Sequence, residues 1–212
     1  MKILIACEES QTVCNSFRKL GFDCYSCDVE PTRGNPLYHI QGDAIDQAYS
    51  GEYHLMIAHP PCTYMSRAGA RWMYQNGTIN EDRLKKAYKA REFFNNLLNA
   101  PINHIAIENT TPLKIIKLPD PSQIIQPYQF GNPYSKRTLL WLKNLPVLKY
   151  TKILNEYTPY LPSNTGGKKR GQKYTYKSIN KRDSSVTFQG IADAMADQWG
   201  NYIKNGYEDY ER

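Results

Sequence analysis

Short apolar runs alternate with amphipathic helical stretches over about the first two thirds of this 212-residue chain, and this alternation limits its fold more than any other feature. Five runs have the length and composition of buried strands, and they cover residues 2–6, 22–27, 38–41, 54–58 and 104–107. Strands that alternate with helices predict a doubly wound α/β fold with a mostly parallel sheet.

Three helices are expected from their end signals and apolar faces. Ser10 is a candidate cap for the first helix, and Gly21 is expected to end it. Asn80 is expected to cap a long second helix with two carboxylates in its first turn, and Pro101 to stop that helix. A third helical pattern covers residues 187–204, with its apolar side chains on one side.

The later part of the chain adds a different strand pattern. Residues 124–130 and 138–142 predict two consecutive strands, a late antiparallel hairpin that would make the sheet mixed. We expect residues 1–212 to form a single domain with one core, interrupted by a short basic insert at about residues 145–184.

The charge of the chain favours an anionic partner. Lys and Arg number 27 and Asp and Glu number 20, which gives a formal net charge of +7, and a basic surface suits polyanions such as nucleic acid. Part of the excess lies in the insert, where Lys168, Lys169 and Arg170 precede Tyr174 and Tyr176. Such a segment can follow a phosphate backbone and stack bases, or it can be a solvated surface loop.

The five cysteines are odd in number, and neither a secretory signal nor an apolar run long enough for a membrane span accompanies them. We therefore expect free thiols and a cytoplasmic protein, and the small size would suit a virus-encoded protein in the host cytoplasm. Cys24 and Cys27 form a Cys-x-x-Cys pair, but the sequence has no second pair, and we expect no metal site.

The sequence His-Pro-Pro-Cys-Thr-Tyr-Met-Ser, at residues 59–66, directly follows a predicted strand. Proline restricts its own φ and keeps the preceding residue out of the helical region, so the two prolines predict a rigid turn. Cys62 lies in this turn, at the carboxyl edge where open α/β sheets bind ligands, and is a candidate nucleophile. The alternative is that Cys62 is a small buried apolar side chain.

Glu108 and Asn109 end another predicted strand and are expected at the same edge of the sheet as Cys62. A carboxyl group beside a nucleophilic cysteine suits acid–base catalysis. The alternative is that these residues cap a helix that begins near Thr110.

The two motifs resemble those of the DNA cytosine-C5 methyltransferases. That family has a Pro-Cys turn with a serine four residues on, which Cys62 and Ser66 match, and a Glu-Asn-Val strand end, which residues 108–110 match except at Thr110. The segment 185–190 resembles the segment that the family packs near its cofactor. The resemblance implies a Rossmann-like class I methyltransferase fold with S-adenosylmethionine as cofactor and DNA as substrate.

The resemblance also implies roles for individual residues. Cys62 would add as a thiolate to carbon 6 of cytosine, and Glu108 would act as the acid at N3. The base would have to be flipped out of a duplex or arrive single-stranded. The implied cofactor contacts are Ala6, Glu8, Ser10, Asp28, Asp43 and Pro60. The implied substrate contacts are Pro61, Ser66, Asn109, Lys136, Arg137, Lys168, Lys169 and Arg170.

The chain departs from the family pattern in two places. The glycine-rich opening of the family is replaced by residues 5–11, which contain no glycine but include Glu8 and Glu9. The region available for target recognition, residues 145–184, is short, so we expect low or short sequence specificity. Three alternatives remain open: C5 modification of a free cytosine or other pyrimidine nucleotide, an amino-methyltransferase, and a non-catalytic protein that binds a nucleotide or nucleic acid.

Overall fold

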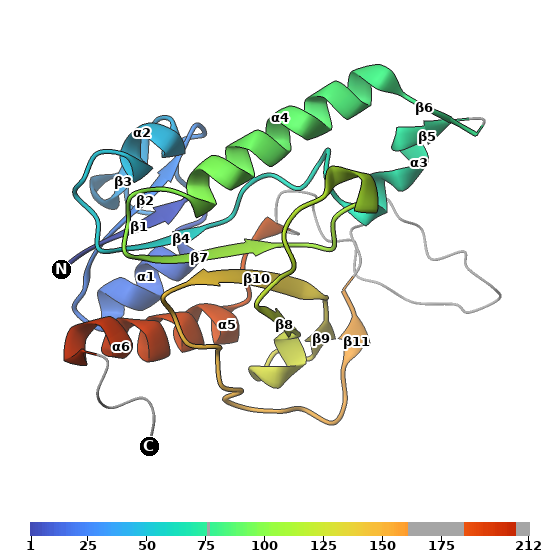
Figure 1. Ribbon diagram of the computed structural model, residues 1–212. Helices are drawn as coiled ribbons and strands as arrows, with labels where there is room; N and C mark the ends of the chain where they lie inside the picture. The colour runs from blue at the N-terminus through green and yellow to red at the C-terminus, as the bar shows by residue number, and fades with distance from the viewer. Residues whose placement is uncertain (76, 161–184, 207–212) are drawn as a thin grey trace.

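A seven-stranded sheet forms the centre of the computed structural model, which describes residues 1–75, 77–160 and 185–206 (Figure 1). The strands lie in the order β3-β2-β1-β4-β7-β10-β8; β10 is antiparallel to both neighbours, and the other pairs are parallel. This arrangement confirms the doubly wound, mostly parallel, Rossmann-like α/β fold predicted from the sequence. The strands are β1 (Lys2–Ala6), β2 (Asp23–Asp28), β3 (His39–Gln41), β4 (Leu55–Ala58), β7 (His104–Asn109), β8 (Gln123–Ile125) and β10 (Thr138–Lys143).

The central parallel strands end close to one another. Ala6 of β1 lies opposite both Cys27 of β2 and Ala58 of β4, and Ala58 lies opposite Ile107 of β7. The segments that follow these four strands therefore start at one edge of the sheet, which is where ligands bind in folds of this kind.

Helices cover both faces of the sheet (Figure 1). Alternate residues of β1 belong to the two cores: Ile3 and Ile5 face one side, and Leu4 and Ala6 face the other. The side of Ile3 is covered by α1 (Thr12–Lys19), α5 (Gln189–Ala194) and α6 (Gly200–Asn205), and the side of Leu4 by α2 (Ala44–Ala48) and α4 (Glu81–Leu98).

Two of the predicted helix ends are confirmed. Gly21 has a φ of 83°, and the amides of Gly21 and Phe22 donate to the carbonyls of Arg18 and Phe17, a Schellman motif that ends α1. Asn80 caps α4, because its side-chain oxygen accepts a hydrogen bond from the amide of Arg83 over 3.0 Å.

Other predicted bounds are wrong. The strand expected over 124–130 is only β8, and a 3₁₀ turn over Pro127–Gln129 follows it, since proline restricts φ and cannot donate to a ladder. β8 does pair antiparallel with β10, but the connection between them contains β9 (Tyr134–Ser135) and not just a tight turn. A π-helical turn, η6 (Met195–Trp199), interrupts the last helix between α5 and α6.

Several short elements had no clear signal in the sequence. Besides α2, they are α3 (Ala70–Met73), the β5–β6 hairpin (Tyr74–Gln75 and Thr78–Ile79), β11 (Thr158–Pro159), and the 3₁₀ turns η1 (Pro36–Tyr38), η2 (Arg67–Gly69) and η3 (Lys114–Ile116). Part of the predicted basic insert, residues 161–184, lies outside the described residues. No helix in the described part of the chain is long and apolar enough to cross a bilayer.

Candidate active site

The turn that carries Cys62 is held from both sides at the carboxyl edge of the sheet. The amide of His59 donates to the carbonyl oxygen of Ala6 over 2.9 Å, and the side-chain amide of Asn109 donates to the carbonyl oxygen of Pro60 over 2.9 Å. The amides of Met65 and Ser66 close the turn by donating to the carbonyl of Cys62 itself. The turn is therefore tied to β1 and β7, the strands on either side of β4, and it presents Cys62 as an exposed residue.

The surroundings of Cys62 favour its thiol form. Although the residue is exposed overall, partial enclosure of the sulfur raises the pKa of Cys62, and the negative charge of Glu108 raises it further. The positive charge of Lys136 opposes both effects. The sulfur therefore lies within electrostatic reach of Glu108 and of Lys136, and forming the thiolate requires a change in that balance.

Glu108 forms an ion pair with His59, a residue that the sequence analysis did not select. Oε2 of Glu108 lies 3.1 Å from Nδ1 of His59, and the two side chains are 18% and 9% exposed. Burial alone would raise the pKa of Glu108, but the hydrogen bond and charge of His59, with the charge of Lys136, outweigh burial and lower that pKa. The only signal in the sequence was the position of His59, directly before the two prolines.

The surroundings of His59 favour the protonated form of its imidazole. Burial would lower the pKa of His59, but the hydrogen bond and charge of Glu108 and the charge of Glu8 raise it, against a small opposing effect of Lys136. Nδ1 is engaged by Glu108, whereas Nε2 is buried and has no hydrogen-bond partner among the described residues.

Glu8, and not Ser10, supplies most of the cap of α1. Its carboxylate accepts hydrogen bonds from the amide of Val13 over 2.7 Å and from the amide of Cys14 over 3.1 Å. The Ser10 hydroxyl accepts only from the amide of Thr12, at 3.3 Å. The expectation that Ser10 caps this helix is therefore wrong in large part, because an acidic side chain reaches back to the orphan amides.

The loop after β1 makes its turns without glycine. Cys7 and Gln11 have φ values of 59° and 58°, the left-handed region that glycine usually occupies. Gln11 is fully buried, and its side chain accepts from the amide of Asn35 over 2.7 Å and donates to the carbonyl of the same residue over 3.0 Å. These side-chain hydrogen bonds hold Gln11 in a conformation that is otherwise costly.

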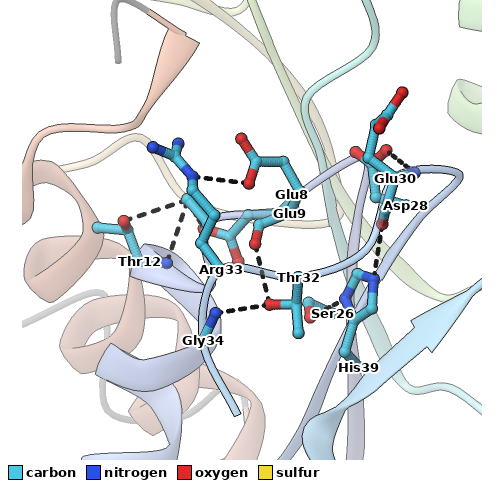
Figure 2. Close-up of polar contacts among 11 residues, drawn as sticks. Glu8, Glu9, Thr12, Ser26, Asp28, Glu30, Thr32, Arg33, Gly34 and His39 are labelled. Atoms are coloured by element: carbon cyan, nitrogen blue, oxygen red, sulfur yellow. Dashed lines mark hydrogen bonds and ion pairs between the residues drawn. The ribbon is translucent and has the colours of Figure 1, made fainter. Parts of the chain in front are cut away.

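The loops after β1 and β2 are joined by a second group of polar contacts (Figure 2). Nε of Arg33 lies 2.7 Å from a carboxylate oxygen of Glu9, and the hydroxyl of Thr32 donates to the carbonyl of Glu9 over 2.9 Å. Glu9 therefore faces Arg33, a partner that the sequence analysis did not anticipate.

Two adjoining cavities open at this edge of the sheet. The larger, of about 720 Å³, lies beyond β2 and β3, and its lining includes Asp28, Asp43, Tyr64, Lys86 and Phe93. The smaller, of about 260 Å³, is lined by residues from the loop after β1, the Pro-Pro turn and the entry to α5. The smaller cavity includes Glu8, Ser10, His59, Cys62, Val186 and Thr187. Cys7, Asp28, Pro61 and Thr63 line both, so the two spaces form one elongated site.

The two acids of the larger cavity are oriented by the backbone. Asp28 accepts the amide of Glu30 over 3.0 Å, and Asp43 caps α2 by accepting the amide of Ile45 over 2.8 Å. Each uses one carboxylate oxygen in this way, and the other has no hydrogen-bond partner among the described residues. The apolar wall beside them includes Val29, Ala44, Tyr64, Ala90 and Phe93.

The predicted site residues lie in different parts of the structure. Asp28, Asp43, Ser10, Pro61 and Cys62 line the cavities, and Glu108 and Lys136 are coupled to Cys62 by charge. Ala6, Pro60 and Ser66 are buried in the scaffold of the turn. Arg137 is exposed just before β10, and Lys168, Lys169 and Arg170 lie outside the described residues.

Asn109 and Glu8 also make structural contacts in this region. Asn109 is 5% exposed, its amide nitrogen donates to Pro60, and its amide oxygen accepts from the amide of Thr110. Glu8 is also 5% exposed, and its carboxylate faces the amides of α1. Both side chains therefore help to hold the site in place, Glu8 also lines the smaller cavity, and their contacts to a ligand stay predictions.

Comparison with known proteins finds similar folds and no similar sequences. No family model matches the chain, and no curated protein matches it. A protein assigned as a DNA modification methyltransferase and encoded within an E. coli prophage is 11% identical, with 73% of this chain and 52% of that chain covered and a TM-score of 0.43. A mutant of Spodoptera frugiperda DNMT2 is 16% identical, with 78% and 56% covered and a TM-score of 0.37.

The chain thus spans just over half the length of these two solved structures.

Proposed function

We propose that this protein transfers a methyl group from S-adenosylmethionine to carbon 5 of cytosine in DNA, through a covalent adduct with Cys62. The main support for this proposal is the position of Cys62. This exposed residue lies beside the elongated site that Asp28 and Asp43 line, and the charge of Glu108 acts on its thiol. A nucleophile, an acid–base group and a cofactor-sized cavity thereby share one edge of the sheet.

The larger cavity fits a nucleoside-bearing cofactor. Its apolar wall, with Tyr64 and Phe93, suits a flat ring, and the second oxygens of Asp28 and Asp43 suit hydroxyl and amino donors. The smaller cavity would take the other end of the cofactor, between Ser10 and Cys62. When bound there, the cofactor supplies an electrophilic methyl group.

The chain's own residues would prepare the base for that methyl group. The Cys62 thiolate bonds to carbon 6 of the ring, which moves electron density to carbon 5. Glu108 acts as the acid at N3. Lys136 favours the thiolate, because its positive charge lowers the pKa of Cys62. A base then takes the carbon 5 proton, the electrons of that carbon–hydrogen bond re-form the carbon 5–carbon 6 double bond, and the thiolate leaves carbon 6.

A polymer substrate is supported by charge and by aromatic side chains near the site. Tyr134, Tyr160 and Phe188 form an aromatic cluster with ring centroids 4.8 to 5.6 Å apart, and Nζ of Lys136 lies 5.6 Å from the centre of the Tyr160 ring. Aromatic rings beside a lysine are suited to stacking an unpaired base next to a phosphate. The net charge of +7 favours the same partner.

The test is incorporation of labelled methyl groups into duplex DNA, single-stranded DNA and dCMP. We expect incorporation into DNA by the natural protein and none by Cys62→Ala, with Cys14→Ala as the control that removes a buried thiol elsewhere. Thermal unfolding of both variants checks that they fold. Incorporation by Cys62→Ala would disprove the adduct, and activity on dCMP alone would replace DNA by a free nucleotide. An absence of calorimetric heat with S-adenosylmethionine would leave a non-catalytic binding protein.

A further inference from the structure

The side chain of His59 contacts one carboxylate of the candidate site and is influenced by the charge of a second. Its Nδ1 is 3.1 Å from Oε2 of Glu108, and the charge of Glu8 acts on the same ring. The described residues give the other oxygen of Glu108, Oε1, no hydrogen-bond partner. Glu108 therefore has one oxygen on the imidazole and one oxygen available to a ligand.

This arrangement bears on a chemical requirement of the proposed reaction. When a thiolate bonds to carbon 6 of cytosine, the ring electrons move toward N3, and a proton at N3 stabilises the adduct. A carboxyl group that is ion-paired to a buried imidazolium does not itself hold that proton. The ion pair of His59 and Glu108 does hold a proton that could be transferred, and this proton is on the imidazole of His59.

Resting on the proposed function, we propose that His59 is the proton donor of the site and acts through Glu108. As the Cys62 sulfur bonds to carbon 6, the carbon 5–carbon 6 π electrons form a carbon 4–carbon 5 double bond, and the N3–carbon 4 π electrons move onto N3. The Nδ1 proton of His59 passes to Oε2 of Glu108, rotation of the resulting carboxylic acid brings this O–H to N3, and N3 takes the proton. Glu108 ends as a carboxylate and His59 as a neutral imidazole, and the proton returns when the thiolate leaves.

The charged groups around the imidazole support this role. The charge of Glu108 acts on it from the end of β7 and that of Glu8 from the loop after β1, and among the described residues Lys136, just before β10, acts in the opposite direction. The two carboxylates raise the pKa of His59 and so favour the protonated imidazole, whereas the ammonium group of Lys136 opposes them. The side chain is 9% exposed, so the proton is shielded from exchange with bulk water.

The decisive measurement is hydrogen exchange at carbon 5 of cytosine in an oligonucleotide, without cofactor, as a function of pH. This exchange requires the Cys62 adduct and the proton at N3 but no methyl transfer. His59→Asn keeps an N–H donor near the position of Nδ1 and removes the transferable proton. We expect His59→Asn to lose about a hundredfold in exchange rate at pH 7.5, with a loss that shrinks toward pH 5 as Glu108 becomes protonated directly.

Parallel pH profiles for His59→Asn and the natural protein would mean that His59 has a structural role only, and the proposed function would stand. An absence of both exchange and methylation in the natural protein would overturn the proposed function and this inference together. Imidazole NMR gives an independent reading, since the chain has four histidines and the His59 signal can be assigned. The inference requires that His59 titrate above its ordinary pKa and that Glu108→Gln lower this pKa; a His59 that is neutral at pH 7 would contradict it.

Discussion

The side-chain amide of Asn109 donates a hydrogen bond of 2.9 Å to the carbonyl oxygen of Pro60, and this contact joins the end of β7 to the turn after β4. Both groups are buried. The contact therefore connects the strand end that carries Glu108 with the turn that carries Cys62.

Asn109→Ala should destabilise the protein and loosen the turn. The substitution leaves the buried carbonyl of Pro60 without its donor, and we expect a loss of about 1–3 kcal/mol in the free energy of unfolding. Urea unfolding measures this loss. Asn99→Ala is the matched control, because the side chain of Asn99 donates to Asn95 at an exposed helix end. If both substitutions lowered the free energy of unfolding equally, the buried Asn109 contact would contribute no more to stability than the exposed Asn99 contact.

The reactivity of Cys62 should respond in opposite directions to its two charged neighbours. Glu108 raises the pKa of Cys62 and Lys136 lowers it, so Glu108→Gln should speed alkylation by iodoacetamide at pH 8 and Lys136→Ala should slow it. Because alkylation proceeds through the thiolate, its rate follows the change in the thiolate fraction that each substitution causes. Mass spectrometry of the Cys62 peptide measures the rate, and Arg137→Ala serves as the neighbouring-charge control. The reverse order of rates would contradict the electrostatic assignment.

The ion pair of His59 and Glu108 should make stability depend on pH within a defined window. The raised pKa of His59 gives stability that is complete below about pH 6.5 and lost as pH rises through the raised value. The lowered pKa of Glu108 gives stability that is complete above about pH 4.3 and lost as pH falls through the lowered value.

Glu108→Gln should therefore cost most between about pH 4.3 and pH 6.5, by about 3 kcal/mol in the free energy of unfolding. Denaturant titrations across pH 3–9 measure this difference, with the exposed Glu92→Gln as control. A difference that does not vary with pH would argue against the ion pair.

Asp28 should contribute to cofactor binding through its free carboxylate oxygen. Asp28→Asn keeps the acceptor for the amide of Glu30 and removes the charge, and we expect S-adenosylmethionine to bind about ten- to hundredfold more weakly by calorimetry. Asp23→Asn, at the opposite end of β2, is the matched control and should bind as the natural protein does. Equal affinities for Asp28→Asn and the natural protein would remove Asp28 from the cofactor site.

Gly190 should not tolerate a side chain. A Cβ at this position would lie 1.8 Å from the carbonyl oxygen of Phe130, so Gly190→Ala must displace backbone at the start of α5, at a cost of about 1–3 kcal/mol or more. Gly42→Ala provides the comparison, since a Cβ there would meet nothing within 4 Å. Thermal unfolding that shows the same midpoint for both variants would contradict the close approach.

Local signals in the sequence determined much of the fold. β1, the Asn80 cap of α4 and the Gly21 end of α1 depend on short-range patterns of apolar, capping and glycine residues, and all three are confirmed. The common edge for Cys62 and Glu108 also followed from sequence, because parallel strands end on the same side. The roles of these two residues stay predictions.

Only the tertiary structure decided which groups pair at that edge. Glu8 reaches the amides of α1, His59 reaches Glu108, and Asn109 reaches Pro60. The last two contacts join residues 49 positions apart in the chain. Such partners depend on the register of neighbouring strands and on which polar groups burial leaves unsatisfied, and neither quantity is encoded in a local pattern.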